Sequence, residues 1–355
     1  MKKKIIFTLG ILIIVFIFTI STYFKSETND TVSNIINSND NEIKLLKDGT
    51  KYLVHPDKIR SGGPPKDGIP SIDNPKFVTV KNADEWIQDN ELVLALNYNG
   101  VKKVYPLQIL VWHEIVNDFA KDKPILITYC PLCGSGIAYE RKINNETVEF
   151  GTSGKLYNSN LIMYDRLTST YWTQIDGLAI IGDLTGFELN EISIDTVRWD
   201  EWKNEHPDSL VLSQDTGFDR QYGTDPYGSY YDESNLFFPV ENTDNSVHPK
   251  TVIYGIEINE TYKAYTESLV NILGSFTDEI NGTMINITKN PDGSVYIYDI
   301  KTNKEIVKER DFWFAWYAFH PETELFRSDF SYILHGLDQG SLCEASVFLN
   351  AKSVT

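Results

Sequence analysis

Two stretches of the chain repeat one pattern of apolar strand, polar turn and apolar strand. The first covers 93–105 and turns at Asn99-Gly100, and the second covers 253–265 and turns at Asn259-Glu260. Asn-Gly between two alternating apolar runs is the strongest short signal for a β-hairpin. Because the two stretches align without a gap, we predict two hairpins of the same length.

The segments that follow the two hairpins also correspond. Each hairpin leads into a short amphipathic stretch, then an apolar strand candidate, then an aromatic run. The matching segments are 107–119 and 267–276, then 124–129 and 283–288, then 171–172 and 312–316. We interpret this as an internal duplication, with half-repeats at about 76–190 and 250–326 that share one core. The alternative is that any two hairpins look alike.

The region between the halves adds two local predictions. Trp199 and Trp202 stand three residues apart, which suits a short helix that ends before Pro207. Residues 222–231 are rich in turn formers and aromatics, and they predict a surface loop. The fold class is therefore mainly β (α+β), with two β-rich halves and a few short helices.

The N-terminus has the pattern of a membrane anchor. Three lysines at 2–4 precede an apolar run at 5–24 that contains no charged residue. Twenty helical residues at about 1.5 Å each span roughly 30 Å, the thickness of the hydrocarbon core. The run is too long for a signal sequence and no Ala-x-Ala-like site follows it, so an uncleaved anchor is favoured over a cleaved signal sequence.

This anchor sets the predicted organisation and location. We predict a transmembrane helix at 1–24, a flexible stalk at 25–45 and a single globular β-rich domain at 46–345. The basic flank is expected to stay inside, which places the domain outside a single-pass cell membrane, in an extracellular or periplasmic space.

Composition restricts the partners. Hydrophobic residues make up 41% of the chain and charged residues 23%, as in folded globular proteins. Lys and Arg number 32 against 50 Asp and Glu, a net charge of −18, which repels nucleic acid and anionic lipid. We therefore expect no nucleic-acid partner, and membrane contact through the N-terminal helix alone. Only three cysteines are present, so at most one disulfide can form and the core must supply the stability.

Two of the cysteines form the most specific chemical motif, Cys130-Pro131-Leu132-Cys133-Gly134. This spacing is that of the knuckles in zinc ribbons, but the chain has no second Cys-x-x-Cys to complete one. A metal site would need histidine, carboxylate or Cys343, and the candidates are His113 and His320. Two cysteines with one or two histidines suit one copper or zinc ion, with copper slightly preferred. The leading hypothesis is thus an extracytoplasmic metal-binding protein.

Two other classes of function remain open. The same pair could serve a thiol-disulfide oxidoreductase, although Gly134 and Gly136 follow the cysteines where a thioredoxin-like site would begin a helix. The pair could also be a structural disulfide in a non-enzymatic surface binding module, with the aromatic loop at 222–231 holding the ligand. The sequence leaves enzymatic activity undecided.

A polar segment at 151–160 supplies further candidates. It lacks the spacing of a phosphate-binding loop and the G-x-S-x-G elbow of a serine hydrolase. We interpret it as a polar loop that lines a pocket, together with the glutamate that follows His113. The predicted pocket-lining residues are Glu114, Ser153, Lys155, Tyr157 and Asn158.

Together these strings resemble a family of prokaryotic proteins, the domain of unknown function 3179, over about 58–326. The strings that carry the resemblance are Tyr105-Pro106-Leu107, Trp112-His113-Glu114-Ile115-Val116-Asn117-Asp118, Thr128-Tyr129-Cys130-Pro131-Leu132-Cys133-Gly134, Ser153-Gly154-Lys155-Leu156-Tyr157-Asn158-Ser159-Asn160-Leu161, Met163-Tyr164-Asp165-Arg166 and Phe319-His320-Pro321-Glu322-Thr323. The resemblance implies a commonly exported protein, and it implies no particular activity.

Overall fold

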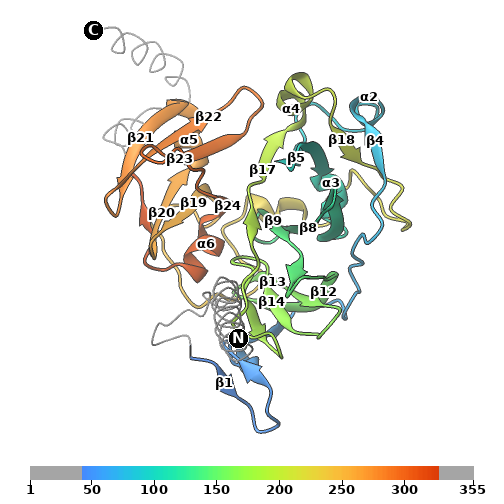
Figure 1. Ribbon diagram of the computed structural model, residues 1–355, viewed down its shortest axis with the longest axis vertical. Coiled ribbons are helices and arrows are strands. Elements are labelled where there is room, and N and C mark those ends of the chain that lie inside the picture. Colours follow the sequence, from blue (N-terminus) through green and yellow to red (C-terminus); the bar gives the residue numbers. More distant parts are fainter. Residues whose placement is uncertain (1–41, 328–355) are drawn as a thin grey trace, which may run out of the picture.

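The computed structural model describes residues 42–327, which form several small β-sheets and a few short helices (Figure 1). The predicted anchor at 1–24, most of the predicted stalk at 25–45, and Cys343 lie outside the described residues. Within 42–327, no helix combines the length and the apolar character that crossing a bilayer requires.

Both predicted hairpins form, and each lies at the centre of a sheet. In both sheets one strand pairs antiparallel with the first hairpin strand, and another pairs parallel with the second. The first sheet has the order β17 (Asp195–Arg198), β5 (Leu92–Tyr98), β6 (Val101–Pro106), β18 (Leu210–Leu212) and β4 (Phe77–Thr79). The second has the order β24 (Glu309–Phe312), β19 (Val252–Ile258), β20 (Thr261–Thr266) and β25 (Glu324–Leu325).

Each amphipathic stretch after a hairpin starts as a short helix and continues as a strand. The first helix is α3 (Leu107–Leu110), and the second is α5 (Glu267–Leu273), which ends at Gly274 with φ +68°. The strands that follow form two further sheets. One has the order β16 (Glu191–Ile192), β9 (Ser135–Glu140), β8 (Lys123–Cys130) and β7 (Ile115–Ala120), and the other has β21 (Ser275–Ile280), β22 (Thr283–Lys289) and β23 (Val295–Asp299).

The two aromatic runs do not occupy matching elements. Residues 313–319 form α6 (Trp313–Phe319) after β24, whereas Tyr171 and Trp172 lie in β14 (Tyr171–Thr173). The helix that corresponds to α6 by position is α4 (Trp199–Glu205), which follows β17 as α6 follows β24. The spacing of the aromatic residues explains the difference. Trp199 and Trp202 are three residues apart, so they share one face of a helix and both are buried. Tyr171 and Trp172 are adjacent in a strand, so their side chains point to opposite faces of the sheet.

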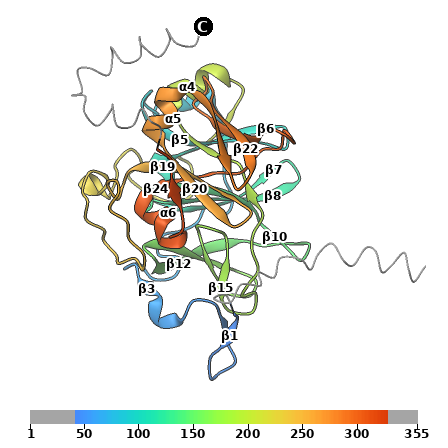
Figure 2. The same ribbon diagram turned by 90° about the vertical axis from the view of Figure 1, so that its left-hand side faces the viewer.

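The remaining large sheet has seven strands and lies below the first sheet in Figure 1. Its order is β1 (Lys44–Leu45), β2 (Lys51–Tyr52), β15 (Ala179–Ile181), β14, β13 (Asn160–Asp165), β12 (Phe150–Tyr157) and β3 (Arg60–Ser61). The smaller elements are the hairpin β10 (Lys142–Ile143) and β11 (Glu146–Thr147), the short helix α2 (Val80–Ala83), and two 3-10 turns, η1 (Pro56–Lys58) and η2 (Gly228–Tyr231). Figure 2, turned by 90°, shows the second half covering one side of the first.

The segment at 151–160, predicted as a loop, is mostly strand β12. Its pairing with β13 is interrupted by a bulge between Thr152 and Lys155. Gly154 lies in this bulge with φ +70°, and a Cβ there would come within 2.2 Å of the Pro64 carbonyl oxygen. The glycines that suggested a loop therefore mark a bulge where another segment packs closely against the strand.

Candidate functional site

Residues 130–134 form a tight turn between β8 and β9. The amide of Cys133 donates to the carbonyl oxygen of Cys130 at 3.1 Å, and Gly134 donates to Pro131 at 3.3 Å. Gly134 has φ +61°, and a Cβ there would lie 2.9 Å from the ring of Phe312 on β24. Glycine is required here because the second half of the molecule packs directly on the turn.

Both thiols of this turn, the Cys turn, are free and buried. The sulfur of Cys133 accepts a hydrogen bond from Asn160 Nδ2 at 3.5 Å and lies 3.6 Å from the Ser159 carbonyl oxygen. Burial, together with the adjacent Cys130 thiol, raises the pKa of Cys133. The Cys133 thiol therefore lacks the low pKa of a reactive cysteine, which argues against a thioredoxin-like mechanism at this residue.

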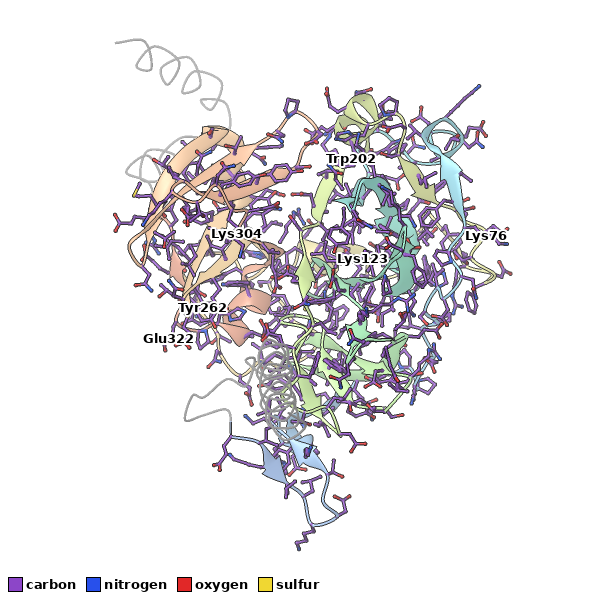
Figure 3. The ribbon with its side chains drawn as sticks, in the orientation of Figure 1. Lys76, Lys123, Trp202, Tyr262, Lys304 and Glu322 are labelled. Carbon is purple, nitrogen blue, oxygen red and sulfur yellow. The ribbon has the colours of Figure 1, made fainter. Side chains whose placement is uncertain are left out.

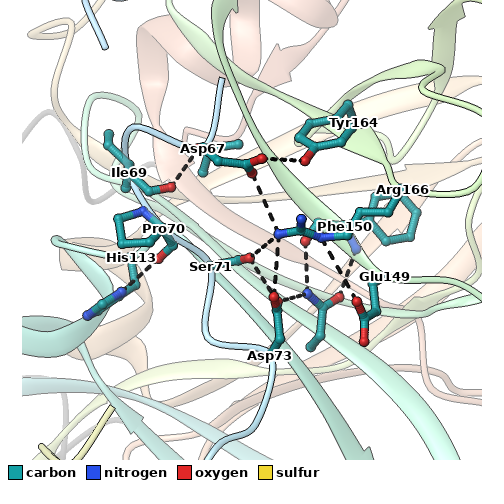
Figure 4. Close-up of polar contacts among 12 residues, drawn as sticks. Asp67, Ile69, Pro70, Ser71, Asp73, His113, Glu149, Phe150, Tyr164 and Arg166 are labelled. Atoms are coloured by element: carbon teal, nitrogen blue, oxygen red, sulfur yellow. Dashed lines mark hydrogen bonds and ion pairs between the residues drawn. The ribbon is translucent and has the colours of Figure 1, made fainter. Parts of the chain in front are cut away.

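His113 lies in different surroundings (Figure 4). Its Nδ1 is 2.7 Å from the carbonyl oxygen of Pro70, and its Nε2 is 2.7 Å from the hydroxyl of Tyr222. Burial lowers the pKa of the ring. His113 is thus a neutral residue with both nitrogens hydrogen-bonded, and it links the segment before β4 to the loop at 222–231.

His320 is the residue at the C-terminal end of α6 and lies next to Asp176 of the first half. Its Nε2 lies 3.1 Å from Asp176 Oδ1, without the alignment of a good hydrogen bond, and its ring stacks on Tyr262 with centroids 4.4 Å apart. Among the described residues, no three His, Cys, Asp or Glu side chains are arranged to hold a metal ion together. The structure therefore brings Cys130 and Cys133 together and gives His113 and His320 other partners.

The predicted pocket-lining residues make structural contacts. Ser153 Oγ donates to Ile162 O at 2.5 Å across the bulge, and Asn158 Nδ2 donates to Ala318 O at 3.1 Å, which ties the β12–β13 turn to α6. Glu114 is buried, and this burial raises its pKa to about 8. None of Glu114, Ser153, Lys155, Tyr157 and Asn158 lines either of the two large cavities described next.

A cleft of about 540 Å³ opens beside the Cys turn. Its wall combines the end of β8, the helix α3, the loop at 222–231 and β24. The residues that line it are Glu91, Leu92, Leu107, Gln108, Val111, Tyr129, Gly134, Gly223, Thr224, Asp225, Tyr231, Val252, Arg310 and Phe312. The aromatic loop predicted to hold a ligand thus does line a cleft, and the Cys turn contributes to the same wall.

Three charged groups line this cleft, the guanidinium of Arg310 and the carboxylates of Glu91 and Asp225. Arg310 is largely buried, and within 42–327 only its Nε is hydrogen-bonded, to Glu267 Oε1 at 2.8 Å. Asp225 accepts from the hydroxyl of Tyr231 at 2.9 Å and from the amide of Tyr227 at 2.8 Å. The sequence did not single out Arg310, because nothing local distinguishes an arginine in a strand from an exposed one.

A second cavity of about 610 Å³ lies between residues 176–191 and the second sheet. It contains His320 together with many carboxylates, whereas the Cys turn lies elsewhere. The two cavities therefore differ in electrostatic character, one of mixed charge and one acidic.

The fold and the site define a mainly β protein with a buried Cys-x-x-Cys turn beside a ligand-sized cleft. Residues 66–323 match the family described as Protein of unknown function (DUF3179), and the chain belongs to this family. This confirms the family assignment predicted from the motifs. No curated protein and no solved structure matches the chain.

Proposed function

We propose that this protein is a binding module that holds a small organic anion in the cleft beside the Cys turn. The observation that carries the proposal is the environment of Arg310. Its Nε is held by Glu267, and within 42–327 its two terminal nitrogens form no hydrogen bond. A guanidinium whose two terminal nitrogens are available can bind a carboxylate, phosphate or sulfonate through two parallel hydrogen bonds.

The rest of the lining suits the body of such a ligand. Aromatic and aliphatic side chains form most of the wall, and Gln108 and Thr224 add neutral polar groups. Pockets of this kind bury an apolar body and fix its orientation through a few polar contacts. The carboxylates of Glu91 and Asp225 already accept hydrogen bonds, from Gln108 and from the loop, and Arg310 is the charged group of the lining that has donors available.

We expect full-length protein in mild detergent to bind benzoate or benzenesulfonate and to bind neutral benzyl alcohol much more weakly, as measured by calorimetry. The pair Arg310→Met/Glu267→Gln removes the guanidinium without stranding Glu267, and it should weaken anion binding about tenfold or more. Leu107→Trp should fill the cleft, and Leu167→Trp, at an exposed leucine elsewhere, is the matched control. Equal affinity for the anions and the alcohol would contradict the proposal.

The location that we propose for this module is the outer face of a cell membrane. The lysines at 2–4 and the apolar run at 5–24 support a single-pass anchor with its basic flank inside. The net charge of −18 repels nucleic acid and anionic lipid, which supports a domain that contacts neither.

We infer that the two hairpin sheets arose by duplication of one unit. Their strand order supports this, and so does a buried ion pair at the same place in both, joined by a tyrosine hydroxyl. The pairs are Lys103–Asp118 at 2.6 Å with Tyr105 at 2.7 Å, and Lys263–Asp278 at 2.7 Å with Tyr265 at 2.8 Å. The helix after each outer strand also ends at a histidine, His206 in α4 and His320 in α6.

Metal binding by Cys130 and Cys133 stays a prediction, and a thiol count tests it. We expect both thiols of the native full-length chain to resist an aromatic disulfide reagent and to react after unfolding, because both are buried. A Cys343→Ser background restricts the count to the pair. Metal analysis of the same sample tests for copper or zinc, and stoichiometric metal that is lost in Cys130→Ser would establish the site. Rapid reaction of the native thiols would contradict their burial.

A further inference from the structure

The second cavity, called here the acidic cavity, has an unusual excess of negative charge. Its carboxylates are Asp176, Glu188, Glu191, Glu257, Asp299, Glu305 and Glu309. Among its described lining residues, Lys304 is the single lysine or arginine. Figure 3 marks Lys304 and Tyr262 on the second half of the molecule. A low-dielectric cavity with this charge concentrates cations.

One of these carboxylates, Glu309, is buried. The residue is only 7% exposed, and its Oε2 has no hydrogen-bond partner among the described residues. Burial, with the nearby Asp311 and Glu191, raises the pKa of Glu309. A buried carboxylate in this state is neutralised either by a proton or by a positive ligand.

The first sheet shows how the corresponding carboxylate is neutralised. Asp195 pairs in register with Ala95 on β5, just as Glu309 pairs with Gly255 on β19. There the ammonium of Lys308 lies 2.9 Å from Asp195 Oδ1, and the two side chains are 2% and 8% exposed. An ammonium group thus fills the position beside the carboxylate in the first sheet.

The first half supplies no ammonium group to Glu309, because the residue that corresponds to Lys308 is not a lysine. Lys308 immediately precedes Glu309, whereas the residue that precedes Asp195 is the apolar Ile194. The free space differs accordingly, because the cavity beside Asp195 holds about 30 Å³ and the acidic cavity about 610 Å³. The space beside Glu309 in the second sheet is therefore larger than the space beside Asp195 in the first sheet, and no lysine of the described part of the chain bonds to the Oε2 of Glu309.

We propose that the acidic cavity binds an organic ammonium ion, an aliphatic amine or polyamine, with one ammonium group against Glu309. Tyr262 and Trp316 also line the cavity, and aromatic rings attract such cations. Carboxylates nearer the rim, such as Glu188 and Glu257, hold further ammonium groups. An organic cation is favoured over a metal ion because no three ligating side chains of the described residues converge on one point. This site is separate from the anion cleft.

Calorimetry of full-length protein with spermidine tests the proposal. We expect saturable binding that Glu309→Gln weakens about tenfold or more, since this change removes the charge and keeps the shape. The rim double variant Glu188→Gln/Glu257→Gln alters exposed residues only, so it tests the site even if Glu309→Gln folds poorly. Glu146→Gln, an exposed glutamate on β11, is the matched control and should bind like the parent chain.

Three results would overturn the proposal. They are no binding of spermidine at millimolar concentration, equal binding by all variants, and tighter binding of Mg²⁺ with the same dependence on Glu309. The cleft variant Arg310→Met/Glu267→Gln should keep its affinity for spermidine. A failure of the anion-binding function is therefore distinguishable from a failure of this one.

Discussion

Replacing Asn160 by alanine is expected to lower the free energy of unfolding by about 3 to 5 kcal/mol, because several buried hydrogen bonds lose a partner at once. Asn160 Oδ1 accepts from the amides of Gln174 at 3.0 Å and Ile175 at 3.1 Å. Its Nδ2 donates to Gln174 Oε1 at 2.7 Å and to the sulfur of Cys133. The truncation would leave the Ile175 N–H and the Gln174 Oε1 without partners in a site closed to water, whereas the Gln174 N–H keeps the carbonyl oxygen of Leu161.

Urea unfolding of the full-length chain measures this effect as a lower midpoint at an unchanged slope. Asn160→Asp keeps an acceptor for the two amides and loses the donor, so it should also destabilise the protein. The matched control is Asn204→Ala on the exposed side of α4, which we expect to change stability by less than about 0.5 kcal/mol. Similar midpoints for Asn160→Ala and Asn204→Ala would show that the network around Cys133 contributes little.

Replacing Glu114 by glutamine is expected to stabilise the protein at alkaline pH and to change little at acidic pH. Burial raises the pKa of this carboxyl from 4.5 to about 8. The folded chain therefore holds the proton up to about pH 8, whereas the unfolded chain loses it near pH 4.5. The contribution of Glu114 to stability falls as pH rises through this window, by about 3 to 5 kcal/mol in total. Glutamine has no proton to lose and avoids this fall.

The measurement is the free energy of unfolding of both chains between about pH 4 and pH 9. The two curves should lie close together at the acidic end and diverge towards the alkaline end, with the Glu114→Gln variant above. Glu146→Gln, which alters an exposed carboxylate, should instead follow the parent curve. Parallel curves for Glu114→Gln and the parent would mean that Glu114 is ionised at neutral pH in the folded chain.

Local pattern was sufficient for the elements that depend on near neighbours. The hairpins at 93–105 and 253–265 form as predicted, since alternation and turn chemistry act within a few residues. The Trp199 and Trp202 spacing correctly predicted α4. The segment at 151–157 was wrongly predicted as a loop, because its glycines serve a bulge against Pro64, a residue about ninety positions away.

The features of the candidate site also fall into those that local sequence predicts and those that depend on the tertiary structure. The sequence by itself determined that Cys130 and Cys133 lie together, since a turn of four residues brings them together wherever it occurs. It also determined the family, through strings of adjacent residues. Only the tertiary structure decided that both thiols are buried, that Cys133 contacts Asn160, that Arg310 faces a cleft and that the buried Oε2 of Glu309 has no hydrogen-bond partner among the described residues. These features join residues far apart in the chain, and such contacts depend on strand order and register, which no local pattern encodes.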